Sequence, residues 1–210
     1  MKKIIVLIAA MTLLAGSAFA QISGTPHDLS NGNNGSTSTS DEICVFCHTP
    51  HNASSAGFAP LWNRTTVLAT DFYTGPGSLN ATVDLASVNA TDAPLCLSCH
   101  DGSSLAQALN NPPNANLDAG TSVGITIGTN AILGTDLSND HPVGFDYSGI
   151  NTLDAEIETL ADATAKGVQF FAGGTDMWCS SCHDVHDNTN GAFLNVDNAG
   201  SNLCLACHIK

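Results

Sequence analysis

Cys44-Val45-Phe46-Cys47-His48 is the first of four copies of one five-residue pattern, Cys-x-x-Cys-His. The other copies begin at Cys96, Cys179 and Cys204. The chain has eight cysteines, and the four motifs contain all of them: Cys44, Cys47, Cys96, Cys99, Cys179, Cys182, Cys204 and Cys207. No cysteine is therefore left over for a disulfide bond outside the motifs.

The spacing is the attachment signature of c-type haem. In that chemistry two thiols bind the two vinyl groups of one porphyrin, and the adjacent imidazole binds the iron as proximal ligand. A zinc half-site or a redox dithiol can also contain Cys-x-x-Cys, but neither requires the following histidine or explains four copies. The sequence therefore predicts four covalently attached haem c groups, with the proximal iron ligands His48, His100, His183 and His208.

The chain has eight histidines, twice the number of predicted irons. Four histidines lie outside the motifs, one for the distal position of each predicted iron: His27, His51, His141 and His186. Met177 is the one methionine beyond residue 20, so His/Met ligation could serve one haem at most. The count predicts bis-histidine ligation throughout, which favours electron exchange at low potential. We expect no enzyme, since a multihaem enzyme needs an iron with an open position.

The order of motifs and histidines occurs twice. Residues 44–51 match residues 179–186, residues 95–100 match residues 203–208, and a lone histidine precedes each set. Such self-similarity predicts one structural unit used twice. The two dihaem units would cover about residues 21–110 and 135–210.

His48 and His51 lie three residues apart, on one side of a turn, so they cannot bind opposite faces of one haem. His51 must then serve a different iron, and the same holds for His186 beside His183. As a hypothesis, the repeat pairs His27 with His48, His141 with His183, and His186 with His100. His51 would then bind the haem at His208 of a neighbouring molecule. Such a head-to-tail contact does not close, so it predicts a homopolymer.

Residues 1–20 predict a secretory signal peptide, with Lys2 and Lys3 before an apolar stretch and Ala18-Phe19-Ala20 as the cleavage pattern. Cleavage would leave residues 21–210 as an exported tetrahaem domain without a membrane span. We expect it to be extracellular or at the cell surface, or alternatively periplasmic. Beyond the signal, three basic residues, Arg64, Lys166 and Lys210, face 19 acidic ones, which excludes nucleic acid as a partner.

The sequence predicts a loop-rich fold, mainly irregular with a few short α-helices and little sheet, wrapped around a stack of four haems. Small and polar residues between the motifs indicate loops, above all over residues 21–40. Asp92 and Pro94 predict that a helix starts at the second motif. We further expect a short helix near residues 61–68, a strand at 123–127 and a helix over 152–165.

At these residues the chain resembles the extracellular multihaem cytochromes that polymerise into conductive filaments, the cytochrome nanowires, and among them the tetrahaem OmcE type. The resemblance lies in the signal peptide, the four motifs, the stretch from Cys44 to Asn52, and Pro60-Leu61-Trp62-Asn63-Arg64. It implies bis-histidine ligation, one axial histidine donated between subunits (here His51), and electron export to other redox proteins or extracellular metal oxides. A monomeric periplasmic tetrahaem shuttle is the alternative.

Overall fold

The computed structural model describes residues 21–54, 60–73, 83–103, 109–112 and 127–209. The predicted signal peptide and nearly all of the predicted strand at 123–127 lie outside these residues. The α-helices of the described part are short: α2 Leu85–Asn89, α3 Ala93–His100, α4 Ile150–Leu153, α5 Leu160–Ala165 and α6 Asn202–Cys207. Between them lie the 3-10 turns η1 Ser30–Gly35, η2 Ile43–Phe46, η5 Thr129–Ala131, η6 Cys179–Ser181 and η7 Ala199–Ser201.

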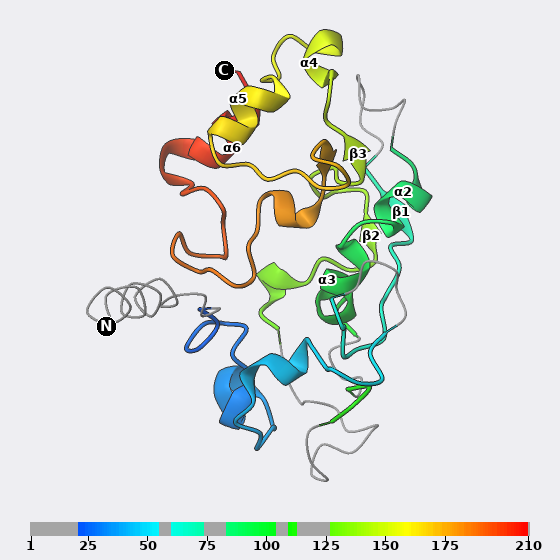
Figure 1. The fold of residues 1–210 in the computed structure, drawn as a ribbon, viewed down its shortest axis with the longest axis vertical. Helices are drawn as coiled ribbons and strands as arrows, with labels where there is room; N and C mark the ends of the chain where they lie inside the picture. Colours follow the sequence, from blue (N-terminus) through cyan, green and yellow to red (C-terminus); the bar gives the residue numbers. More distant parts are fainter. Residues whose placement is uncertain (1–20, 55–59, 74–82, 104–108, 113–126, 210) are drawn as a thin grey trace, which may run out of the picture.

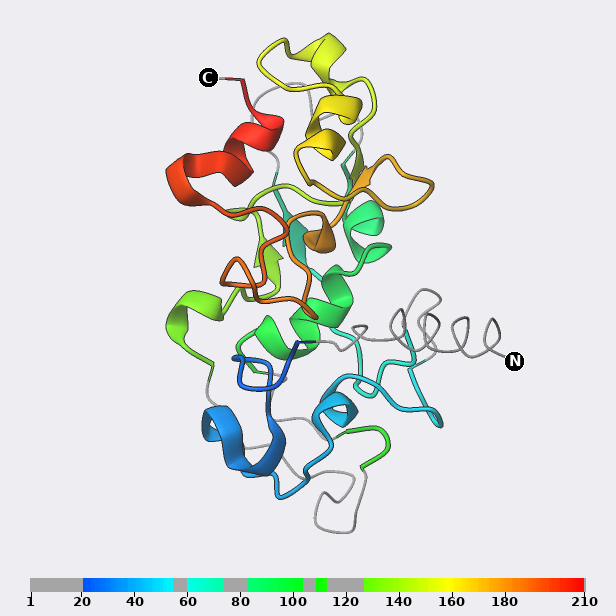
Figure 2. The same ribbon diagram turned by 60° about the vertical axis from the view of Figure 1, so that its left-hand side comes forward.

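The strands are two residues long and form two separate pairs. β1 (Asp71–Phe72) runs parallel to β2 (Asp136–Leu137), and β3 (Phe145–Asp146) runs antiparallel to β4 (Asp176–Met177). In both views the blue segment after residue 20 lies toward the lower end of the molecule, α3 near the middle, and α5 and α6 toward the upper end (Figures 1 and 2). The segment after residue 20 and the helices α5 and α6 therefore lie toward opposite ends of the molecule (Figures 1 and 2).

Apolar side chains form three small clusters within the described part of the chain. The largest, in the second half, joins the two strands of the β3–β4 pair to the helices near the C-terminus: Phe145, Tyr147, Ile150, Ala163, Val168, Met177 and Ala206. A second surrounds α3, with Val88 and Leu97 each 1% exposed. The third contains Val45 and Phe46 of the first motif, with Leu109. Protein side chains alone thus build separate patches of core.

The helix start predicted at the second motif is confirmed, since α3 begins at Ala93 with proline in its first turn. The helix predicted over 152–165 is confirmed only for its second part, α5. The chain between α4 and α5 pairs with the C-terminus instead: Glu158 N–H donates to the carbonyl of Cys207 at 2.8 Å, and Ile209 N–H donates to that of Glu156 at 2.7 Å. Thr159 then caps α5 by accepting from the N–H of Asp162 at 3.1 Å.

The short helix predicted near residues 61–68 is wrong. Leu61 has a φ of 55°, which lies in the left-handed region, and Trp62 forms an isolated β-bridge with His48. The backbone of this stretch forms hydrogen bonds with other segments, as when Asn63 N–H donates to the carbonyl of Cys47 and Val67 N–H to that of Pro94, so these groups are not available for a helix.

Candidate haem sites

Each motif occupies a single turn, and two kinds of turn alternate along the chain. The first and third motifs contain the 3-10 turns η2 and η6, whereas the second and fourth form the C-terminal parts of α3 and α6. In three motifs the histidine N–H donates to the carbonyl of the first cysteine, four residues earlier: His48 to Cys44 at 2.8 Å, His183 to Cys179 at 3.2 Å and His208 to Cys204 at 2.9 Å. The turn thus keeps both cysteines and the histidine together, as attachment to one porphyrin requires.

Backbone carbonyls of distant loops orient the imidazoles of three motif histidines. Nδ1 lies within hydrogen-bond distance of a carbonyl oxygen in each: His48 and Pro60 at 2.6 Å, His100 and Ala131 at 2.7 Å, His183 and Ala192 at 3.0 Å. A carbonyl only accepts, so each of these bonds requires the proton on Nδ1 and leaves the lone pair of Nε2 for a metal. Histidine ligands of metal ions are generally held in this way.

The structure brings a histidine from outside the motifs beside each of three motif histidines. The ring centroids lie 6.0 Å apart for His48 and His186, 6.1 Å for His100 and His27, and 6.5 Å for His208 and His141. Two imidazoles that bind opposite sides of one metal ion at about 2.0–2.1 Å each have ring centres about 6–6.5 Å apart. These three pairs therefore fit the axial ligand sets of three haem irons.

These pairs differ from the ones that the repeat predicts, namely His27 with His48, His141 with His183, and His186 with His100. The N-terminal arm explains the change for His27. Its first described residue, Gln21, donates its N–H to the carbonyl of His186 at 2.7 Å, and the ring of His27 stacks on Phe193 at a centroid distance of 4.3 Å. The arm therefore packs against the second half of the chain, and the assumption that each lone histidine stays in its own half fails.

Within the described part of the chain, the ring contacts leave His51 and His183 without a histidine partner. Both residues are exposed. His183 lies close enough to His27 for its charge to affect that ring, but the ring contact of His27 is with His100. One motif histidine and one distal candidate thus remain, and both face solvent.

Two asparagines hold the first and third motifs in the same way. Each donates its N–H to the carbonyl of the second cysteine and its side-chain amide to the carbonyl of the residue after the first: Asn63 to Cys47 and Val45 at 2.8 and 2.7 Å, and Asn195 to Cys182 and Ser180 at 2.8 and 2.9 Å. Both asparagines lie in loops that follow their motifs. Sequence reasoning missed them, because the two loops differ in length and share few residues.

The two residues before each asparagine are also alike in the two loops. Leu61 and Phe193 both have a left-handed backbone, with φ of 55° and 56°. Their carbonyls accept from the residue after the motif histidine at 2.8 Å in both cases, and the following residues bridge to that histidine: Trp62 to His48 and Leu194 to His183. We call Leu61–Asn63 and Phe193–Asn195 the clasp loops. A shared apolar-apolar-Asn pattern is the sequence signal that would have found them.

A carboxylate ties the second motif to the third. Asp92, the N-cap residue of α3, accepts from the N–H groups of Cys179 at 3.0 Å and Ser180 at 2.8 Å, and from the hydroxyl of Ser180. The side chain of Cys96 lies against that of Cys179, and this contact, together with burial, raises the pKa of the Cys179 thiol. The thioether positions of two predicted haems are therefore adjacent.

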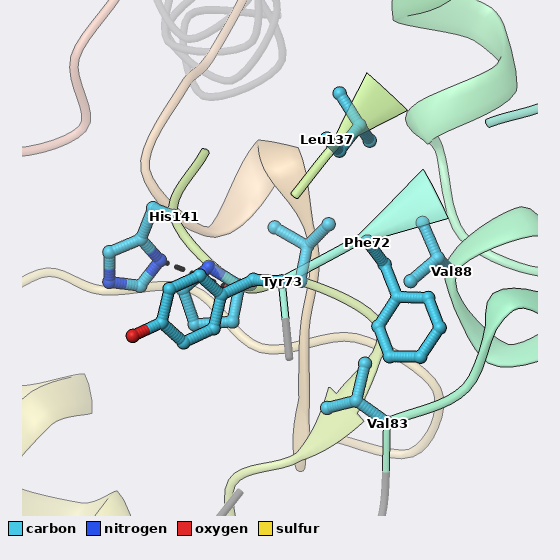
Figure 3. A pocket seen from close by; sticks show the side chains of 8 residues that line it. Phe72, Tyr73, Val83, Val88, Leu137 and His141 are labelled. Atoms are coloured by element: carbon cyan, nitrogen blue, oxygen red, sulfur yellow. Dashed lines mark hydrogen bonds between the residues drawn. The ribbon is translucent and has the colours of Figure 1, made fainter. Parts of the chain in front are cut away.

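His141 lies beside an apolar pocket (Figure 3). Its Nδ1 is 3.0 Å from the carbonyl of Pro142, which again directs Nε2 toward a metal. The pocket is lined by Phe72, Tyr73, Val83, Val88, Leu137, Pro142 and Val143 together with His141. Apolar side chains of this kind are what the edge of a porphyrin requires of its surroundings.

Burial keeps His27 neutral. The pKa of His27 is lowered to about 4, chiefly by burial and further by the neighbouring charges of His100, His183 and His186. A neutral imidazole has the lone pair that iron requires. Met177, the alternative distal ligand, is 2% exposed in β4 and packs within the largest apolar cluster.

The side chains fit the zinc and disulfide alternatives poorly. All eight cysteines are unpaired. Among the described residues, no group of three or more His, Cys, Asp or Glu side chains is arranged to hold a metal ion alone, whereas a structural zinc site needs four such ligands together. In the same residues no helix is long and apolar enough to cross a membrane.

One family comparison bears on these sites. A protein-family model described as "Doubled CXXCH motif" matches residues 171–210, which contain the third and fourth motifs, the second clasp loop and α6. The match indicates covalent haem c binding. It points to a protein like the multihaem c-type cytochromes, and electron transfer is the role that this motif indicates. No curated protein matches the chain.

Proposed function

We propose that the chain binds four haem c groups, all with two histidine ligands, and conducts electrons along a filament of head-to-tail subunits. When bound, haem iron supplies one-electron exchange between its ferric and ferrous states. The three histidine pairs at 6.0–6.5 Å carry the proposal, because each joins one motif histidine to one outside the motifs. In this arrangement the protein supplies both axial ligands and leaves no position for a substrate.

Different groups of residues hold different parts of each haem site. Eight cysteines provide the thioether bonds, and carbonyls of Pro60, Ala131 and Ala192 fix the tautomer of the motif histidines. The clasp loops hold the first and third motifs, and Asp92 sets the spacing between the second and third. Because the contact of Asp92 joins the second motif to the third, it favours closely packed haems, which electron hopping needs.

His51 and His183 support the polymer. With the other six histidines paired in the described chain, His51 is the donor and the haem at His183 the acceptor that remain for a contact between subunits. This replaces the partner expected from the repeat, the haem at His208, beside which the structure places His141. The contact joins different surfaces of two copies, so it propagates into an open filament. The exposure of both residues is consistent with it.

Haem counting and electron microscopy of the secreted, haem-loaded chain test this function. A haemochrome assay should give four haems per chain, and negative-stain images should show unbranched filaments of constant width. His51→Ala should keep four haems but yield separate subunits. In those subunits the haem at His183 should bind carbon monoxide after reduction, whereas wild-type filaments should bind none.

Three results would contradict parts of this proposal. Fewer than four haems would refute the cofactor count. Single particles from the wild type, with all haems in the low-spin state, would favour the periplasmic shuttle, because His51 would then have found an iron in its own chain. Normal filaments from His51→Ala would refute the donated ligand.

A further inference from the structure

Arg64 is a buried cation between the first two motifs. Its side chain is 1% exposed, and it directly follows the first clasp loop, whose Asn63 binds the first motif. Trp62 of the same loop donates its indole N–H to the hydroxyl of Ser98, inside the second motif, at 3.2 Å. The backbone that carries Arg64 is therefore fixed to both motifs.

The charge of Arg64 acts on both motifs. Asn63, the residue before Arg64, donates its N–H to the carbonyl of Cys47 at 2.8 Å, and the guanidinium of Arg64 lies close enough to Cys47 and Cys99 to interact electrostatically with both side chains. Cys47 and Cys99 are the second cysteines of the first and second motifs, each next to a proximal histidine. The cation is thus within electrostatic range of two haem-binding positions at once.

The second half of the chain has no such charge at the equivalent position. The residue after the second clasp loop is Val196, where the first loop is followed by Arg64. The other basic residue of the described part, Lys166, is exposed and pairs with Glu158 at 2.5 Å, so its charge is largely offset. The nearby buried charge at the third motif is negative, that of Asp92, which lies between the second and third motifs and has no equivalent at the first.

We propose that Arg64 raises the reduction potentials of the haems at His48 and His100 above those of the haems at His183 and His208. This inference rests on the proposed haem binding. A ferric iron carries one more positive charge than a ferrous iron, so a fixed cation nearby disfavours the oxidised state more strongly. A buried charge such as that of Arg64 is screened less by water and salt than an exposed one. An arginine serves this purpose well, because it does not lose its proton.

The test is a redox titration of the haem-loaded full-length chain, followed by NMR so that the signals of each haem are resolved. His51→Ala keeps the subunits separate for this measurement if the wild type polymerises. Arg64→Met removes the charge with a side chain of similar length, Arg64→Lys retains the charge, and Lys166→Met removes the exposed cation as a matched control. Arg64→Met should lower the potentials of the haems at His48 and His100 selectively. Arg64→Lys should leave their order unchanged, and Lys166→Met should leave all four nearly unchanged.

An equal shift of all four potentials in Arg64→Met, or no shift with four haems bound, would overturn the proposal. Should Arg64→Met fail to mature, the wild-type titration decides: the two highest potentials must belong to the haems at His48 and His100, and any other order overturns the proposal. A chain without covalent haem would instead refute the function on which the inference rests, so the two failures are distinguishable.

Discussion

At the scale of single residues, the eight histidines have two distinct tasks. Three of those in the motifs, His48, His100 and His183, are fixed twice, by their own turn and by a carbonyl at Nδ1. In the proposed function, those outside the motifs reach the irons from other segments, and His27 lies on an arm that packs against the opposite half of the chain. The proximal ligands therefore come with the motif, whereas the distal ligands depend on the tertiary fold.

His186 tests the assignment of distal ligands within one chain. In His186→Ala the iron at His48 loses its second axial ligand, because His186 is the histidine beside it at 6.0 Å. We expect isolated His186→Ala subunits, prepared with His51→Ala, to bind one more carbon monoxide per chain than His51→Ala subunits alone and to show added high-spin character. Flash photolysis and absorption spectra would measure both. Equal carbon monoxide stoichiometry in the two preparations would rule out this pairing.

Much of the site at this scale could be predicted from the sequence, and the limit has a physical origin. Covalent attachment requires fixed local spacing, so the four motifs and their proximal histidines are visible in the chain itself. A distal histidine needs only to reach an open face of iron, and any loop can provide it. The partners of His27, His141 and His186 therefore came from the structure, and the predicted pairs did not match it.

At the scale of elements, short turns are held by side chains in place of long hydrogen-bonded helices. The clasp loops and Asp92 satisfy backbone groups at the starts and ends of the motifs. The loop-rich fold could be predicted from the sequence, and so could the start of α3, which Asp92 and Pro94 indicate. The gap between α4 and α5 could not, because it results from pairing with the C-terminus, far away in the sequence.

Replacing Asp92 tests whether single side chains hold the motif turns in place. Asp92→Ala removes a buried carboxylate that accepts from the N–H groups of Cys179 and Ser180, so we expect a loss of about 2–3 kcal/mol in the free energy of unfolding. Urea unfolding of the haem-loaded protein, monitored by circular dichroism, would measure it. The matched control is Asp84→Ala, which removes the exposed N-cap of α2, bound to Ser87 N–H at 2.6 Å, and should cost about 1 kcal/mol. A loss at Asp92 no larger than at Asp84 would contradict the role of Asp92 as a tie between motifs.

At the scale of the whole molecule, charge sets the conditions for assembly. The chain has a formal net charge of −14 at pH 7, so two copies repel each other over long distances. The screening length falls from about 30 Å at 0.01 M salt to about 8 Å at 0.15 M. Contacts at short range, such as a ligand bond from His51, are screened far less.

Filament growth should therefore speed up with salt. We expect the rate of assembly from separated wild-type subunits to rise about tenfold between 0.01 and 0.15 M sodium chloride, as measured by light scattering. Sucrose at matched osmolality is the control, since it leaves charge unscreened. A rate that falls with salt would mean that opposite charges guide the two surfaces together, in conflict with the dominance of net repulsion.

In the residues that the structure describes, the apolar core is divided into three small clusters, and this division has a consequence for the lifetime of the protein. Clusters of this size cannot offset the conformational entropy of so many loops, so the cofactors have to supply the remaining cohesion. In a chain to which one haem has not been attached, the segment around that motif is less well packed, and proteases can cut it. Under the proposed function, a subunit that lacks a haem would therefore be both unable to pass an electron and more readily degraded than a complete one.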